Sequence, residues 1–360
     1  MSQKGPEIRK EDSPLKVLVV DDSPMMCRVI EEILLEDGQV GHVDRALNGR
    51  EAISRIGSDS YDVCTLDVHM PGMNGLSVLK NIMVRTPVPT LMVSAFTGDG
   101  SRVTFEALRY GAVDFFKKPS RNGDEDLLEQ AETLRQRVRR AARVQVRAAR
   151  YLRLRPRPKT GRLAGEPGLF SQLVVISAGT GGYSSLLSLI PALSGSAAAP
   201  IVVSLTTPPQ YLNAFVDYLA SYSSIPLKRA ESVQVLQPGT AYFLASDEAA
   251  SFEQAGGKWE MAVETRPIDA ENEGPVDLIL LSASEHFGNG LLSIFLSGDS
   301  PYGVTGAEEV KRNGGTVLVQ EPAECLSPMT PDLLRQQVEA EALECSALRT
   351  AVEKWGAEAR

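Results

Sequence analysis

Short apolar runs alternate with helical patterns along most of this chain, and that alternation limits the possible folds more than any other feature. From Lys16 the sequence reads KVLVV, a helical stretch from Met25 to Leu35, and then YDVCTLD, PTLMVSA and DFFKKP with helical stretches between them. The same style returns from Leu173 in LVVIS, PIVVSL, LLSIFLS and TVLVQ. Such an order is typical of βα units around a parallel sheet. At 360 residues, the sequence predicts two α/β domains.

A basic segment marks the boundary between these domains. Positions 135 to 162 hold eleven Arg, one Lys and no acid; the whole chain has a net charge of −9, and removing these 12 positive charges leaves −21. Because Pro156, Pro158 and several glycines close the segment, we expect a helix that runs into a linker. The expected divisions are an N-terminal tail 1–14, a first domain 15–125, an Arg-rich helix and linker 126–168, a second domain 169–340 and a C-terminal helix or tail 341–360.

The arginines of this segment follow a helical spacing. Positions 135, 139, 143, 147 and 150 are all arginine, which would place them on one face of a helix. We interpret this stripe as a helix that docks on the acidic remainder of the same chain. An acidic protein partner, nucleic acid or lipid are the alternatives. Since Tyr151 is the only aromatic residue nearby, no nucleic-acid binding is expected.

Polar residues end the strands of the first domain. Asp21 and Asp22 follow the first apolar run, Asp67 and Ser94 end later runs, and Lys118 follows the last. Because ligands bind at the carboxyl ends of parallel strands, we expect these residues to converge on one crevice. Three close carboxylates would repel one another without a hard cation, and Mg²⁺ prefers oxygen ligands.

This residue set predicts phosphoryl chemistry. Asp67 can act as a carboxylate nucleophile, while Mg²⁺ and Lys118 neutralise the phosphoryl oxygens and Ser94 donates a hydrogen bond. A cis bond between Lys118 and Pro119 would aim the amine inward, and we state it as a hypothesis.

The segments VLVVDDSPMMCRVI, TLDVHMPGMNG, VSAFT and GAVDFFKKPS resemble the signature segments of response-regulator receiver domains, over about residues 16–120. The resemblance implies a flavodoxin-like (βα)5 fold that a sensor histidine kinase phosphorylates on Asp67, with Mg²⁺ held by Asp21, Asp22 and Asp67. It also implies that Ser94 and Phe115 are switch residues and that Lys118 contacts the phosphate. His69 is interpreted as a loop side chain beside the site.

The second half resembles the catalytic domain of the chemotaxis protein-glutamate methylesterases, which implies a doubly wound, mostly parallel sheet. That family uses a Ser, His and Asp triad, and this chain differs at each position. Gly179 stands at the nucleophile in SAGTGG, Thr206 at the base in LTTPP, and Tyr302 at the orienting acid in GDSPYG. None of these residues can perform its assigned role. We therefore expect a catalytically inactive binding module, with chemoreceptors or their signalling complex as partners and no confident catalytic residue.

Three other interpretations stay open. Ser177, Asp299 and His286 supply the three triad residue types nearby, so the domain could be an active methylesterase or glutamine deamidase with a rearranged site. The turn from Gly179 to Gly182 could bind an anion on its backbone N–H groups. The whole chain could also act as a phosphate sink with a vestigial second domain.

The N-terminus, the apolar stretches and the cysteines indicate in which compartment the protein is expected. The N-terminus is polar, and no apolar stretch approaches the length of a membrane span. The four cysteines show no paired metal-type spacing, which suits reduced thiols. We therefore expect a cytoplasmic protein without membrane insertion.

Overall fold

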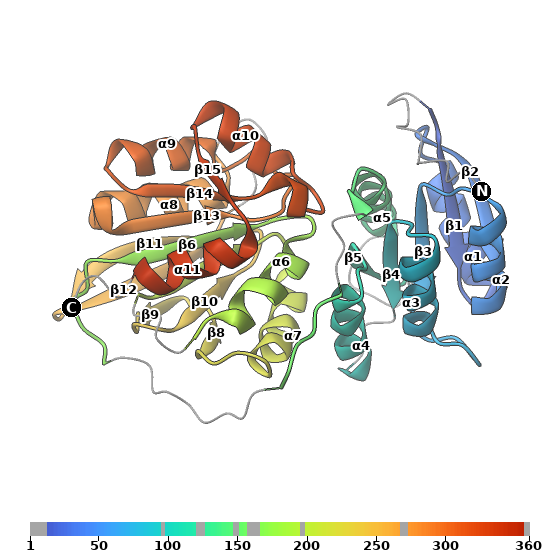
Figure 1. The fold of residues 1–360 in the computed structure, drawn as a ribbon, viewed down its shortest axis with the longest axis horizontal. Coiled ribbons are helices and arrows are strands. Elements are labelled where there is room, and N and C mark those ends of the chain that lie inside the picture. The colour runs from blue at the N-terminus through green and yellow to red at the C-terminus, as the bar shows by residue number, and fades with distance from the viewer. Residues whose placement is uncertain are drawn as a thin grey trace. The chain divides into compact units, whose positions relative to one another are not determined.

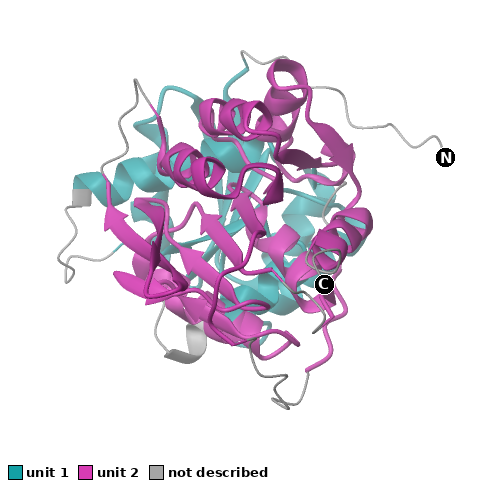
Figure 2. Cartoon of the chain, turned by 90° about the vertical axis from the view of Figure 1, so that its left-hand side faces the viewer, with its two compact units in different colours: residues 1–146 teal, residues 147–360 magenta. Residues whose placement is uncertain are grey.

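The computed structural model describes residues 13–94, 98–119, 127–146, 151–156, 166–194, 199–266 and 273–355. The chain divides into two units, residues 1–146 and 147–360 (Figure 2). Each unit is an α/β domain, which confirms the predicted fold class. No helix among the described residues is both long and apolar enough to cross a bilayer.

The first unit contains five parallel strands in the order β2-β1-β3-β4-β5 (Figure 1). Its elements are β1 (Leu15–Val20), α1 (Pro24–Leu35), β2 (Val40–Ala46), α2 (Gly49–Ser58), β3 (Val63–Asp67), α3 (Gly75–Arg85), β4 (Thr90–Ser94), α4 (Gly98–Arg109), β5 (Asp114–Lys117) and α5 (Leu127–Ala142). Helices α1 and α5 contact each other, as do α2 with α3 and α3 with α4. Helices therefore form two groups around the sheet, as a doubly wound fold requires.

Three of these helices begin after a polar residue whose side chain caps the helix N-terminus. The side chains of Ser23, Asn48 and Asn74 accept hydrogen bonds from backbone N–H groups in the first turns of α1, α2 and α3. These caps satisfy donors that have no partner within a helix. They set where each helix starts, and so they set the length of each loop that follows a strand end.

The second unit is built on a seven-stranded parallel sheet in the order β15-β14-β13-β6-β7-β10-β8. Its strands are β6 (Leu173–Ala178), β7 (Ile201–Leu205), β8 (Leu227–Arg229), β10 (Ala241–Leu244), β13 (Leu291–Phe295), β14 (Thr316–Gln320) and β15 (Glu341–Leu343). A separate antiparallel sheet joins β11 (Glu248–Ala255), β12 (Lys258–Thr265) and β9 (Val233–Val235).

Two groups of helices accompany the large sheet. One group is α8 (Pro275–Phe287), α9 (Val304–Arg312) and α10 (Met329–Gln337); the other is α6 (Gly182–Leu189), α7 (Pro209–Ala220) and α11 (Cys345–Trp355). Short 3-10 turns lie at Ile190–Ala192, Gly288–Gly290 and Pro322–Glu324. Figure 1 draws α8, α9 and α10 together and apart from α6 and α11. The core between them is apolar, with strand residues such as Val175, Phe295 and Val319 buried.

The structure refines two expected boundaries. The chain beyond residue 340, expected as a C-terminal helix or tail, adds β15 to the edge of the sheet and packs α11 against α6. Helix α5, expected in the linker, lies in the first unit and contacts α1. Sequence periodicity could not show either packing partner, because both lie far away along the chain.

The arginines of α5 pair with acids of their own unit. Arg135 contacts Glu36 at 3.1 Å, and Arg139 pairs with Asp37. For these two arginines, docking on the acidic remainder of the chain is confirmed. The prediction that the arginines form one stripe along a single helix is wrong, because α5 ends at Ala142 and Arg143 lies beyond it. Positions 147 and 150 lie outside the described residues.

Candidate functional site

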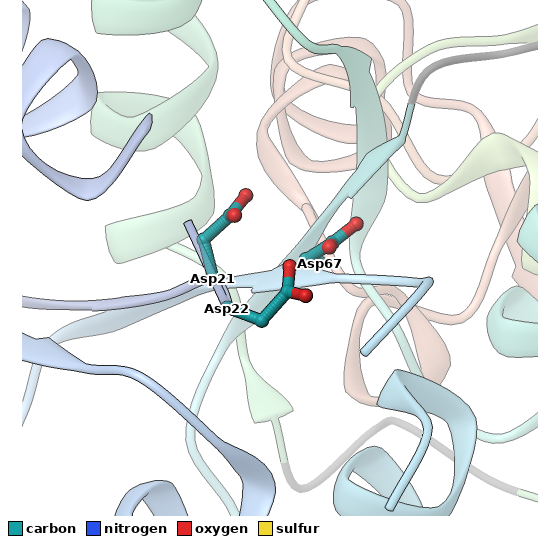
Figure 3. A group of neighbouring side chains, drawn as sticks. All are labelled: Asp21, Asp22 and Asp67. Carbon is teal, nitrogen blue, oxygen red and sulfur yellow. The ribbon is translucent and has the colours of Figure 1, made fainter. Parts of the chain in front are cut away.

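Three carboxylates meet at the carboxyl ends of neighbouring strands in the first unit. Asp21 and Asp22 follow β1, and Asp67 is the last residue of β3. One oxygen of each can be chosen so that all three lie within 4.8 Å of one another. Figure 3 shows the three side chains pointing toward a common region. The parallel pairing of β1 with β3 brings residues 46 positions apart into one crevice.

Lys118 completes this cluster from the end of β5. Its Nζ lies 2.7 Å from Asp21 Oδ2 and 2.9 Å from Asp67 Oδ2. Both aspartates are 1% exposed, whereas Asp22 is exposed to solvent. Burial raises the pKa of Asp67, although Lys118 opposes that effect. Burial alone would lower the pKa of Lys118, but its contacts with the two carboxylates outweigh burial and raise it.

The backbone around Asp67 leaves no space on one side. A Cβ added to Gly75 would lie 2.0 Å from the carbonyl oxygen of Asp67, so only glycine fits there. The N–H of His69 donates to Asp67 Oδ1 at 3.2 Å, and the His69 side chain is exposed. His69 therefore lies beside the site as a loop residue and supports the carboxylate through its backbone.

The two expected switch residues lie on β4, which pairs with the strand of Asp67, and on β5, the strand beyond it. Ser94 ends β4, is buried, and accepts a hydrogen bond on its carbonyl from the N–H of Lys118. Phe115 lies in β5, and its buried ring packs edge-on against Phe105 of α4, with centroids 5.6 Å apart. The described residues contain no cis peptide bond, so the hypothesis of a cis Lys118–Pro119 bond is wrong; the amine reaches the carboxylates from a trans bond.

The donor set fits a hard divalent cation. All three candidate ligands are carboxylates, they come from two strands, and one of them is open to solvent. Oxygen ligands with an open, water-accessible side are what Mg²⁺ prefers. The three aspartates could therefore hold Mg²⁺ between them.

In the second unit, two of the three expected triad positions lie next to each other. The N–H of Thr206 donates to the carbonyl of Ala178 at 2.8 Å, which places Thr206 beside Gly179. The N–H of Gly179 donates to Ser297 of the loop after β13 at 2.9 Å. Strands β13, β6 and β7 are neighbours, so the expected triad positions that follow them lie along the carboxyl-terminal edge of the sheet.

Gly179 has no room for an added side chain. A Cβ at this position would lie 2.9 Å from the Cα of Gly298 and 3.4 Å from the backbone nitrogen of Asp299. Both neighbours are backbone atoms, which cannot move aside as a flexible side chain can. The loop after β13 therefore occupies part of the space that a serine at position 179 would need.

Tyr302 turns toward α8. Its ring atoms lie 2.5 to 2.9 Å from the point where Gly274 would carry a Cβ, so the ring covers that glycine. The ring also packs against the buried apolar core of the unit. Tyr302, expected from the sequence at the position of the orienting acid, is therefore a phenol that packs against the core.

Buried polar residues that the sequence reasoning did not single out hold these loops. Gln320 Oε1 accepts hydrogen bonds from the Ser297 N–H at 3.0 Å and from the Ser185 hydroxyl at 2.8 Å. The Asp277 carboxylate accepts from the N–H groups of Gly274, Gly303 and Gly306. No role for either residue follows from the sequence, because each acts through hydrogen bonds to groups that lie far away along the chain.

The three residues of the rearranged triad are not brought together. Register pairs Leu291 with Leu173 and Phe295 with Ser177, so Ser177 and Asp299 lie at the carboxyl end of the sheet. His286 precedes β13 and packs against Trp259, with ring centroids 5.6 Å apart. Strand β13 rises about 13 Å over the four residue steps from Leu291 to Phe295. His286 is therefore at the opposite edge from Ser177.

Comparison with known proteins covers both units. Residues 17–132 match the response regulator receiver domain family, and residues 174–351 match the CheB methylesterase family. A protein-glutamate methylesterase/protein-glutamine glutaminase of Pyrococcus abyssi is 33% identical over 313 residues, which is 85% of this chain and 84% of that protein. Its counterpart in Thermotoga maritima is 33% identical over 88% of this chain and 90% of its own length.

Among solved structures, the catalytic domain of the Thermotoga maritima CheB methylesterase is 27% identical, with a TM-score of 0.49, and the match covers 52% of this chain and 99% of that one. The matches to the relatives are longer than either unit alone, so they extend into both units. The chain therefore belongs to the protein-glutamate methylesterase family, as a response-regulator receiver domain followed by a CheB methylesterase domain.

Proposed function

We propose that Asp67 accepts a phosphoryl group from a sensor histidine kinase, with Mg²⁺ held by Asp21, Asp22 and Asp67. The observation that carries this proposal is the meeting of three carboxylates within 4.8 Å of one another, with an ammonium group in contact with two of them. A carboxylate cluster beside a fixed cation suits phosphoryl transfer, in which catalysis is mostly positioning and charge neutralisation.

Each residue then has a defined task. An oxygen of Asp67 attacks the phosphorus, the bond between phosphorus and the kinase histidine breaks, and the histidine nitrogen keeps the electron pair and takes a proton. Mg²⁺, when bound, supplies positive charge to the phosphoryl oxygens. Lys118 neutralises another oxygen, and the Ser94 hydroxyl donates a hydrogen bond to the group on Asp67.

Incubation with a small-molecule phosphodonor tests this assignment. With Mg²⁺ present, intact-mass measurement should show one added phosphoryl group on the wild-type chain and none on Asp67→Ala. Asp59→Asn, which changes an exposed acid away from the crevice, serves as the matched control and should label normally. Labelling that survives Asp67→Ala, or that proceeds equally well in EDTA, would contradict the proposal.

We further propose that the second unit regulates a chemotaxis-type signalling complex by binding, with chemoreceptors or their associated proteins as partners. The support is the residue set at the triad positions, Gly179, Thr206 and Tyr302, none of which can serve as nucleophile, base or orienting acid. The backbone of Gly298 beside Gly179 adds to this support. Loss of a complete triad lowers a hydrolysis rate by a factor on the order of 10⁶.

Methanol release from methylated receptor is the direct test. The wild-type chain, with and without phosphodonor, should release no methanol above background, while an active family member run beside it does. The names of the relatives favour the competing function, an active methylesterase or glutaminase. Turnover by the unmodified chain that Ser177→Ala or His286→Ala abolishes would establish that competing function.

A further inference from the structure

Strand β5 connects three parts of the receiver unit over only a few residues. Lys118 follows the strand and contacts Asp21 and Asp67. Phe115, three residues earlier, packs its ring against Phe105 of α4. Any displacement of Lys118 toward a group on Asp67 therefore acts on the strand that also carries Phe115.

Arg137 of α5 binds the same strand from another helix. Its Nη1 donates to the backbone carbonyl of Phe115 at 2.6 Å and to Asp114 Oδ2 at 2.8 Å. The side chains of Arg137 and Asp114 are 15% and 22% exposed. A charged pair that is largely withdrawn from water holds its geometry more firmly than an exposed pair.

The neighbouring arginines of α5 make a different contact. Arg135 and Arg139 bind acids at the end of α1, Glu36 and Asp37. They anchor α5 to another helix, whereas Arg137 anchors it to the strand that precedes Lys118. The two kinds of anchor can therefore be separated by substitution on a single helix.

We propose that Arg137 couples the state of the phosphorylation site to α5. Through its bonds to Asp114 and to the carbonyl of Phe115, Arg137 transmits movement of β5 to the helix that ends at Ala142, just before the boundary between the two units. This inference rests on the proposed phosphorylation of Asp67. Coupling requires that the contact differ between the two states of the receiver.

Hydrogen exchange of α5 amides, measured on the full chain with and without Mg²⁺ and a small-molecule phosphodonor, tests the coupling. In the wild type, phosphorylation should change the exchange rate of peptides from residues 127–142 several-fold. Arg137→Gln should label on Asp67 as the wild type does, while that change falls to less than twofold. Arg139→Gln, the matched control, should keep the wild-type response even though it loosens α5 in both states.

Arg137→Lys adds a rescue. Because one nitrogen makes both bonds in the structure, a lysine amine, which keeps the charge but reaches less far than Nη1, can replace them in part, so this variant should recover part of the wild-type response. A wild-type response in Arg137→Gln, an equal loss in Arg139→Gln, or a labelled wild type with unchanged α5 would each overturn the inference while leaving the phosphorylation itself intact. Failure of the wild type to label at all would overturn the proposed function and the coupling with it.

Discussion

Gly179 has neither a nucleophilic side chain nor free space for a Cβ. The position lacks a nucleophile, and its Cβ direction points at the backbone of Gly298. A glycine in this place lets the loop after β13 approach β6 closely, as the hydrogen bond from the Gly179 N–H to the Ser297 carbonyl illustrates. A serine at position 179 would therefore change packing as well as chemistry.

Gly179→Ser should destabilise the second unit by about 1–3 kcal/mol, because the new Cβ must push backbone apart. It should also release no methanol from methylated receptor, since Thr206 supplies no base. Gly168→Ser is the matched control, because a Cβ there meets nothing within 4 Å, and its effect should stay within about 0.5 kcal/mol. Urea unfolding measures both variants, and equal stability of the two would contradict the close approach.

Tyr61 gives the receiver unit an alkaline pH dependence. Burial raises the pKa of Tyr61 to about 12, and its hydrogen bond to Asp44 Oδ2, at 2.9 Å, adds to the effect. The phenol in an unfolded chain titrates near pH 10. Because the folded pKa is the higher one, the stabilisation is complete below about pH 10 and is lost as the pH rises toward 12.

The whole loss, reached only above about pH 12, should amount to about 2–3 kcal/mol for a shift of this size, and roughly half of it should fall between pH 9 and 11. Tyr61→Phe removes the titrating group, so its stability should fall less than that of the wild type between pH 9 and 11. Denaturant unfolding of both proteins at the two pH values gives the comparison. An equal fall in the two proteins would show that Tyr61 does not carry the dependence.

At the scale of elements, Asp277 joins two helices of the second unit. It lies in the first turn of α8, yet it accepts hydrogen bonds from Gly303 and Gly306, which begin α9. The carboxylate is 2% exposed. One buried side chain thereby caps its own helix and the next one, and it fixes the end of the loop that carries Tyr302.

Asp277→Asn should cost about 3 kcal/mol, because the amide must turn a donor toward one of the backbone N–H groups and leave that group unpaired. Asp332→Asn is the matched control: Asp332 also lies in the first turn of a helix, but its side chain is 42% exposed. The control should change the free energy of unfolding by less than about 0.5 kcal/mol. Comparable costs for the two variants would contradict the role of Asp277.

The elements themselves were largely predictable. Apolar runs such as LVVIS in β6 and LLSIFLS in β13 predict strands because buried parallel strands need continuous apolar side chains. The placement of Asp21, Asp67 and Lys118 at strand ends was predictable for the same reason. The direction of Tyr302 and the partners of Arg137 were not, because both depend on residues far away in sequence that packing brings close.

For the whole molecule, the division into two units predicts separate responses to a ligand. Mg²⁺ should bind the receiver unit alone, since the carboxylate cluster lies entirely within it. A cation that binds only the folded form stabilises that form by mass action. Calorimetry of the full chain should therefore show two transitions, of which Mg²⁺ raises the midpoint of one by a few degrees.

The fragment 1–146 identifies which transition belongs to the receiver. Asp22→Asn should abolish the Mg²⁺ shift and leave the other transition unchanged. An upward shift of both transitions in the wild type would contradict a site confined to one unit, and a shift that persists in Asp22→Asn would contradict the assigned ligands.

The sequence by itself determined the class of both folds, the order of the domains, and the residues that meet at the crevice of three carboxylates and Lys118. It could do so because strand and helix periods are local, and because the ends of parallel strands always lie along one edge of the sheet. Only the tertiary structure decided that backbone fills the space beside Gly179, that Tyr302 covers Gly274, and that Arg137 binds β5. These contacts arise from close packing between distant segments, which no local pattern encodes.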